Sequence, residues 1–186
     1  MTTDYIPDQW VEIILRALYT GNRLVCEVML ATGLRIEDVL TLTRTQILMG
    51  RPTITEKKTG KKRRIYIPKR LQEEIIYYYE QWGAPPPEAT EWAFPSVDMR
   101  KHRTRQAVFY DLKRVADEFG IKFNLAPHSF RKTFAVRKFR ETGDIIHVQE
   151  LLNHDNIAVT AIYALADCVR IRERRAAAKK QKRKKG

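Results

Sequence analysis

One β-prone segment interrupts a chain that otherwise carries helical patterns, and this arrangement restricts the fold more than any other feature. The runs Thr53-Ile54-Thr55 and Arg64-Ile65-Tyr66-Ile67 have the β-branched and aromatic composition of short strands. Between them lies Lys57-Lys58-Thr59-Gly60-Lys61-Lys62, whose glycine suits a tight turn. The sequence therefore predicts an antiparallel β-hairpin with a strongly cationic tip.

Apolar residues at helical spacing cover most of the remaining chain. Helices are expected at residues 8–19, 22–32, 71–82, 104–119, 129–141, 145–152 (capped by Asp144) and 158–166, and another restarts at Leu34 after Gly33. Trp92-Ala93-Phe94-Pro95 is expected to form a short buried strand or turn. The predicted fold class is α+β, mainly helical, with one small antiparallel sheet.

The positive charge of the chain is concentrated at its C-terminus. Residues 169–186 hold ten Lys or Arg against one acid, a net of +9 of the chain's +13, which leaves +4 for residues 1–168. A polyanion is the natural partner of such a tail. Nucleic acid fits better than a membrane, because the sequence has no long apolar run and no lipidation signal. We expect the tail to be disordered without DNA.

The cysteines and the N-terminus point to a cytosolic protein. Cys26 and Cys168 are far apart and lack metal-type spacing, and Cys26 lies in an apolar helical pattern typical of a reduced core thiol. The first residues are polar and acidic, so no signal peptide is expected. No carboxylate pair is placed to hold Mg²⁺, and we expect neither a metal nor another cofactor.

The stretch from Pro127 to Tyr163 carries the residues best suited to chemistry on a phosphodiester. His128 and Arg131 are three residues apart, so on a helix they share one face and could meet one phosphate. Tyr163 follows His154 by nine residues, which leaves room for a turn and a new helix. A phenol has an unperturbed pKa of about 10, so a tyrosine nucleophile needs a base or a cationic environment. Taken singly, each of these side chains is more often structural.

The chain resembles the catalytic domain of the tyrosine recombinases, the phage integrase family. The motifs that carry the resemblance occur in the family's order and span residues 31–163. They are Ala31-Thr32-Gly33-Leu34-Arg35-Ile36-Glu37-Asp38, Lys58-Thr59-Gly60, Pro127-His128-Ser129-Phe130-Arg131-Lys132-Thr133-Phe134-Ala135, Leu151-Leu152-Asn153-His154 and Thr160-Ala161-Ile162-Tyr163. Asn153 stands where the family often has glycine, and asparagine also suits a left-handed helix cap.

The resemblance implies a role for each matching residue. Arg35 and Arg131 would clamp the non-bridging oxygens of the scissile phosphate. Lys58 would protonate the departing 5′ oxygen, with Lys57 as the competing candidate because a hairpin register is hard to fix from sequence. His128 would act as general acid/base or bind the phosphate, and His154 would be a second phosphate donor. Tyr163 would be the nucleophile, and Asp38 would brace the site from behind.

Further basic side chains are candidates for contacts with DNA phosphates. They lie in the hairpin, around the start of the helix at 104–119, and next to Arg131: Lys57, Lys61, Lys62, Arg63, Arg103, Arg105 and Lys132. The alternative for each is a solvated charge with no ligand, and the sequence leaves both open.

By the resemblance, the protein is a site-specific DNA recombinase that acts on double-stranded DNA through a 3′-phosphotyrosine without a metal. A type IB topoisomerase-like enzyme and a non-catalytic DNA-binding regulator with the same fold are the alternatives. The resemblance also implies a tetramer on two duplexes, with the C-terminal segment exchanged between protomers. It places the gene in a bacterial host, a phage or a mobile element.

The expected domain organisation is a catalytic domain at residues 1–168 and a basic tail at 169–186. The N-terminal core-binding domain of typical integrases is not expected. A naturally short recombinase and an excised catalytic domain both fit this organisation.

Overall fold

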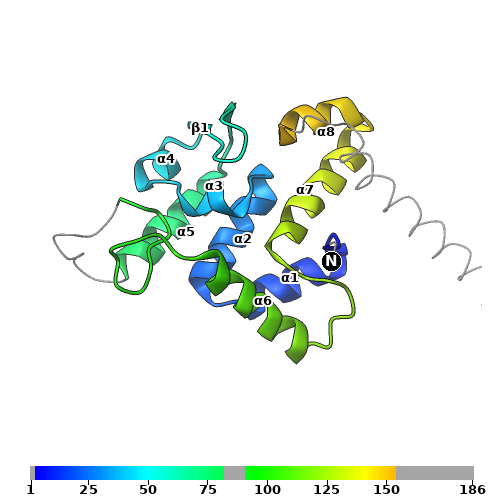
Figure 1. Cartoon of the computed structure of the whole chain (residues 1–186), viewed down its shortest axis with the longest axis horizontal. Helices are drawn as coiled ribbons and strands as arrows, with labels where there is room; N and C mark the ends of the chain where they lie inside the picture. The colour runs from blue at the N-terminus through cyan, green and yellow to red at the C-terminus, as the bar shows by residue number, and fades with distance from the viewer. Residues whose placement is uncertain (1–2, 82–90, 154–186) are drawn as a thin grey trace, which may run out of the picture. The chain divides into compact units, whose positions relative to one another are not determined.

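The computed structural model describes residues 3–81 and 91–153 (Figure 1). Backbone contacts divide the chain into two compact units, Met1–Phe134 and Ala135–Gly186, with the boundary inside helix α7. The predicted site residues His154 and Tyr163 lie outside the described residues, as do Cys168, the predicted helix at 158–166 and the basic tail.

Helix α2 (Thr20–Thr32) lies at the centre of the first unit, and α1, α3, α5 and α6 pack around it (Figure 1). The other helices are α1 (Asp8–Ala17), α3 (Ile36–Leu40), α4 (Arg44–Met49), α5 (Lys69–Glu80) and α6 (Arg105–Glu118), followed by α7 (Pro127–Thr142). Leu24, Val25, Val28 and Met29 of α2 are completely buried, so this helix forms the middle of the core. The predicted mainly helical fold is confirmed.

The predicted hairpin is also confirmed. Strand β1 (Thr53–Thr55) pairs antiparallel with β2 (Lys62–Arg64), and Thr53 faces Arg64 while Thr55 faces Lys62. The second strand begins before the predicted run at 64–67. After β2, the amides of Ile65 and Ile67 still donate to the carbonyl oxygens of Pro52 and Gly50, and both side chains enter the core.

Helix α4 was not predicted from the sequence, although it carries a recognisable start signal. The Thr43 side chain accepts a hydrogen bond from the Gln46 amide at 3.1 Å, and the Gln46 side chain accepts one from the Thr43 amide at 2.9 Å. This reciprocal pair is a capping box, which stabilises the first turn of a short helix. The predicted short element at 92–95 is present as isolated bridges of Trp92 to Thr43 and of Pro95 to His102.

In the second unit, α8 (Ile145–Leu152) has both of its predicted ends. Asp144 caps the helix by accepting hydrogen bonds from the amides of Ile146 and His147 at 2.8 and 3.1 Å. Asn153 ends it in the left-handed conformation, with φ 51° and ψ 38°. Asparagine therefore supplies the geometry that glycine usually gives at this position.

Two further sequence predictions concern the interior and the membrane. Cys26 is a buried free thiol, as predicted, and burial raises its pKa well above the ordinary value. Within residues 3–81 and 91–153, none of the helices combines the length and apolar character that crossing a bilayer requires.

Gly33 should tolerate no side chain, because it ends α2 in the left-handed region with φ +66° and lies against Phe134. A Cβ at this position would lie 2.6 Å from Phe134 Cε1 and closer still to Cδ1. We expect Gly33→Ala to lower the free energy of unfolding in urea by about 2–4 kcal/mol, from conformational strain and overpacking together.

Gly120→Ala is the matched control, since Gly120 also has positive φ (+60°) but no neighbouring atom within 4 Å of the Cβ that alanine would add. It should cost about 1 kcal/mol, the conformational part alone. Equal losses in the two variants would show that the contact with Phe134 carries no penalty.

Candidate active site

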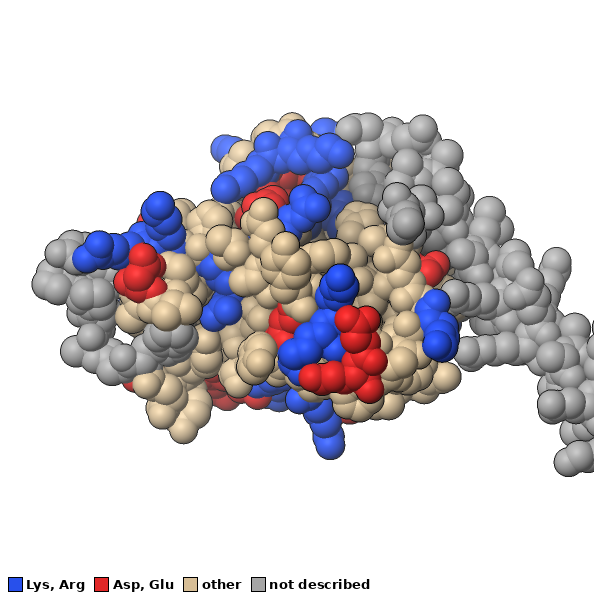
Figure 2. Space-filling view, turned by 60° about the horizontal axis from the view of Figure 1, so that its bottom comes forward, with Lys and Arg blue, Asp and Glu red and all other residues tan. Residues whose placement is uncertain are grey.

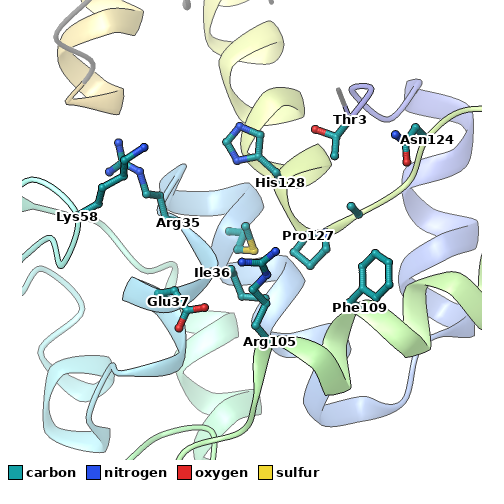
Figure 3. Close-up of a pocket in the computed structure, with 12 residues that line it drawn as sticks. Thr3, Arg35, Ile36, Glu37, Lys58, Arg105, Phe109, Asn124, Pro127 and His128 are labelled. Carbon is teal, nitrogen blue, oxygen red and sulfur yellow. The ribbon is translucent and has the colours of Figure 1, made fainter. Parts of the chain in front are cut away.

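A cavity of about 580 Å³ in the first unit collects side chains from several separate segments (Figure 3). Arg35 enters from the start of α3, Lys58 from the hairpin tip, and His128 from the first turn of α7. Arg105 and Phe109 line it from α6. Three of the residues predicted to be catalytic therefore share one cavity.

The end of α2 determines where Arg35 lies. Gly33 terminates the helix, and its amide donates to the Met29 carbonyl at 2.9 Å. Two residues later Arg35 forms the extended N-cap of α3, with φ −72° and ψ 152°. A left-handed glycine followed directly by a new helix start reverses the chain sharply, and this reversal directs Arg35 into the cavity.

Arg131 lies behind this turn and is completely buried. Its Nη1 donates to the Gly33 carbonyl oxygen at 2.6 Å. Arg131 is absent from the described residues that line the cavity. It therefore has a firm structural contact, and its predicted contact with the scissile phosphate stays a prediction.

Asp38 holds the start of the hairpin turn. Its Oδ1 accepts a hydrogen bond from the backbone amide of Lys57 at 2.8 Å, and the side chain is buried. Burial raises the pKa of Asp38; the Lys57 amide opposes this shift, while the negative charge of Glu56 adds to it. The predicted bracing position of Asp38 is compatible with this contact.

Of the two candidate hairpin lysines, Lys58 lines the cavity (Figure 3). Lys57 is exposed, is not among the described lining residues, and uses its backbone amide on Asp38. This geometry favours Lys58 for contact with a ligand in the cavity.

Hydrogen bonds at the start of α7 fix the backbone around His128. Pro127 opens the helix, where its missing N–H costs nothing because first-turn amides have no helical partner. The Ser129 hydroxyl accepts from the Ala126 amide at 3.1 Å and donates to the Asn124 carbonyl at 3.3 Å. The residues on either side of His128 are thus held in place.

His128 is the most strongly perturbed titratable side chain of the cavity. Its pKa is lowered from 6.5 to about 4, first by burial and then by the positive charges of Arg131 and Lys132. Arg35 and Lys58 lower it further. The imidazole is therefore neutral near pH 7, and a neutral ring nitrogen can accept a proton.

Sequence reasoning missed Glu56, a completely buried carboxylate next to Arg35. Glu56 Oε2 lies 2.5 Å from Arg35 Nη1, and its Oε1 lies 3.4 Å from Arg63 Nη1. The sequence offered a signal only for Arg63. Successive side chains of a strand point to opposite faces, so Arg63 points away from the face of the exposed Lys62 and Arg64.

The other predicted DNA contacts fall into two groups. Lys61, Lys62 and Arg105 are exposed. In contrast, Arg63 donates to the Thr32 carbonyl, Arg103 to the Asn22 side chain and the Tyr78 hydroxyl, and Lys132 to the Thr3 carbonyl. These internal bonds explain the three half-buried side chains, and their contacts with DNA stay predictions.

Much of the described surface pairs its charges locally. In the face shown in Figure 2, several basic side chains lie directly beside acidic ones. Ion pairs such as Arg114 with Glu118 at 2.8 Å and Arg16 with Glu12 at 2.7 Å are of this kind. In the cavity, burial and then the charges of the neighbouring cations lower the pKa of His128.

Comparisons with known proteins identify the family to which the chain is similar. A sequence model described as the phage integrase family matches residues 6–168. "Tyrosine recombinase XerD" of Bradyrhizobium diazoefficiens is 33% identical over 159 residues, which cover 80% of this chain and 49% of the relative. "Probable integrase/recombinase YoeC" of Bacillus subtilis is 32% identical over 134 residues, 71% of this chain and 70% of the relative.

A solved structure shares the fold. The crystal structure of the XerH site-specific recombinase bound to a palindromic difH substrate, a post-cleavage complex, superimposes with a TM-score of 0.73 at 19% identity. The match covers 95% of this chain and 53% of that one. The chain spans about half the length of XerD of Bradyrhizobium diazoefficiens.

The pKa of His128 can be measured by NMR titration of its ring protons, and we expect about 4 in the folded protein. Lys58→Met should raise this pKa, because it removes a positive charge that disfavours the imidazolium, whereas Lys58→Arg should keep it low.

Since the folded pKa of His128 lies below the unfolded value of about 6.5, the unfolded state binds the proton more readily. The contribution of His128 to stability is therefore present above about pH 6.5 and is lost as the pH falls through about 4. A folded-state pKa near 6.5 would contradict this electrostatic description.

Proposed function

Because the chain belongs to the phage integrase family, we propose that it is a site-specific DNA recombinase. It cleaves and rejoins DNA strands through a 3′-phosphotyrosine intermediate. The observation that carries the proposal is the cavity in which Arg35, Lys58 and His128 meet from three distant segments. A guanidinium, an ammonium and a neutral imidazole together suit a phosphodiester whose oxygens gain charge during transfer.

In the proposed reaction, the Tyr163 oxygen attacks the scissile phosphorus and the bond to the 5′ oxygen breaks. The Tyr163 hydroxyl gives up its proton, which neutral His128 is suited to accept, and the departing 5′ oxygen takes its proton from Lys58. Arg35 and Arg131 stabilise the non-bridging oxygens, with His154 as a further donor. The phosphotyrosine conserves the energy of the broken bond, so a 5′ hydroxyl of another strand can reverse the step.

The proposed partner is double-stranded DNA, on which four copies assemble with two duplexes and exchange their C-terminal segments. The structural neighbour XerH is described as bound to its difH substrate, which supports a DNA ligand for this fold. The exposed Lys61, Lys62 and Arg105 would contact backbone phosphates. We place the protein in the cytoplasm, where such DNA is available.

A type IB topoisomerase-like activity would use the same chemistry without exchanging partners. Strand exchange between two sites distinguishes it from a recombinase. A regulator that binds DNA without cutting it is distinguished by the absence of any covalent adduct.

Covalent trapping tests the chemistry directly. We would incubate the protein with a pool of nicked, randomised duplexes, with and without EDTA, and expect an SDS-resistant adduct that mass spectrometry locates on Tyr163. Tyr163→Phe removes the nucleophile and should abolish the adduct while DNA binding persists. Clear binding of DNA without any adduct would instead indicate a regulator.

The role of Lys58 can be tested on the duplexes recovered by trapping. Lys58→Ala should slow cleavage by about 10²–10⁴-fold, the usual range for losing a general acid. A substrate with sulfur at the bridging 5′ position should restore much of the rate, because a thiolate (thiol pKa about 8.5) leaves without a proton.

Lys57→Ala is the matched control and should neither lose as much rate nor respond to the sulfur substitution. If sulfur rescued the Lys57 variant and not the Lys58 variant, the two assignments would be exchanged.

A further inference from the structure

Glu56 is a buried carboxylate in an otherwise cationic part of the chain. It directly follows β1, and Lys57 and Lys58 come next. Its side chain is 0% exposed, so solvent does not compensate its charge. A buried carboxylate stays charged only when close partners compensate its charge. The partners of Glu56 therefore show which groups it holds in place.

The two oxygens of Glu56 join three segments. Oε2 accepts hydrogen bonds from Arg35 Nη1 at 2.5 Å and from the Thr59 hydroxyl at 3.2 Å. Oε1 accepts from Arg63 Nη1 at 3.4 Å. One carboxylate therefore ties Arg35 of the cavity to the hairpin turn and to β2.

The backbone on both sides of Lys58 is held by this arrangement. The Lys57 amide donates to Asp38 at 2.8 Å, and the Thr59 hydroxyl donates to Glu56. The Glu56 carbonyl oxygen also accepts from the Gly60 amide at 2.8 Å, which closes the turn. Lys58 thus projects from a turn that is anchored to the same carboxylate as Arg35.

We propose that Glu56 is a positioning residue, which holds Arg35 and the Lys58 turn in a fixed relation for the reaction. The inference rests on the proposed function. Glu56 is not among the described cavity-lining residues, so it acts through Arg35 and the hairpin rather than on the substrate. Such alignment matters for rate, because small displacements of groups that meet the reacting phosphate are costly.

Glu56→Gln is the informative variant, because it keeps the shape and one acceptor oxygen but removes the charge. We expect it to slow adduct formation on a nicked duplex by about 10–100-fold. In an Arg35→Lys background the same substitution should cost little, because the group that Glu56 positions is already altered. Glu12→Gln, an exposed residue of α1 with the same charge change, is the control and should leave the rate unchanged.

Additive losses in the double variant would overturn the inference, since they would mean that Glu56 acts independently of Arg35. Melting temperatures of all variants would be compared, so that a loss of folded protein is not counted as a loss of positioning. An unchanged rate in Glu56→Gln would likewise overturn it.

Hydrogen exchange provides a readout that does not need activity. In Glu56→Gln, the amides of Lys57 and Gly60 should exchange faster, while those of Leu24 and Val25 in the core of α2 should not change. If wild-type protein forms no adduct, the proposed function fails, and this measurement still tests the anchor. Unchanged exchange at Lys57 and Gly60 would overturn the anchoring by Glu56 whatever the activity.

Discussion

Two arginine side chains hold the backbone turn between α2 and α3, and the position of Arg35 depends on them. Arg63 donates to the Thr32 carbonyl oxygen, and Arg131 donates to that of Gly33 at 2.6 Å. The last carbonyls of a helix have no partner within it and carry partial negative charge, so cationic donors suit them well. The turn that Gly33 permits is thereby fixed in the orientation that brings Arg35 to the cavity.

The arginines that are buried in this way require acidic residues near them. Bringing the charges of Arg35, Arg63 and Arg131 out of water is costly without counter-ions. Glu56 and Asp38 supply negative charge from the buried side. Nevertheless, burial first and then the neighbouring cations lower the pKa of His128 to about 4, so these acids do not cancel the effect of the positive charges on the imidazole. An anion bound there would be expected to raise that pKa, because it stabilises the imidazolium.

Much of the fold was predictable from the sequence because helical periodicity and turn chemistry are local properties. The hairpin, the cap at Asp144 and the left-handed Asn153 are confirmed for this reason, whereas the six residues of α4 are too few to show a clear period. Strand alternation separates Arg63 from its exposed neighbours, but it does not reveal Glu56 as its partner, since a glutamate beside lysines suits a solvated loop and an arginine in a basic hairpin suits a DNA contact. Their partnership is visible only in the folded structure, where Glu56 contacts both Arg35 and Arg63 of β2. The meeting of the predicted catalytic residues in one cavity likewise needed the tertiary fold.

If the chain acts on DNA as proposed, its fixed cations would recognise one phosphate and its exposed cations would provide general attraction to DNA. Residues 1–168 carry only +4 of the net charge of +13, and several of their arginines are used inside the fold. General attraction to a polyanion scales with the number of phosphates neutralised and is therefore assigned mainly to the C-terminal segment and the hairpin tip. The cavity instead acts through a few cations in fixed positions, whose effect depends on their alignment rather than their number. Loss of alignment and loss of charge should consequently have different signatures: the first alters the rate at saturating DNA, and the second alters affinity and its dependence on salt.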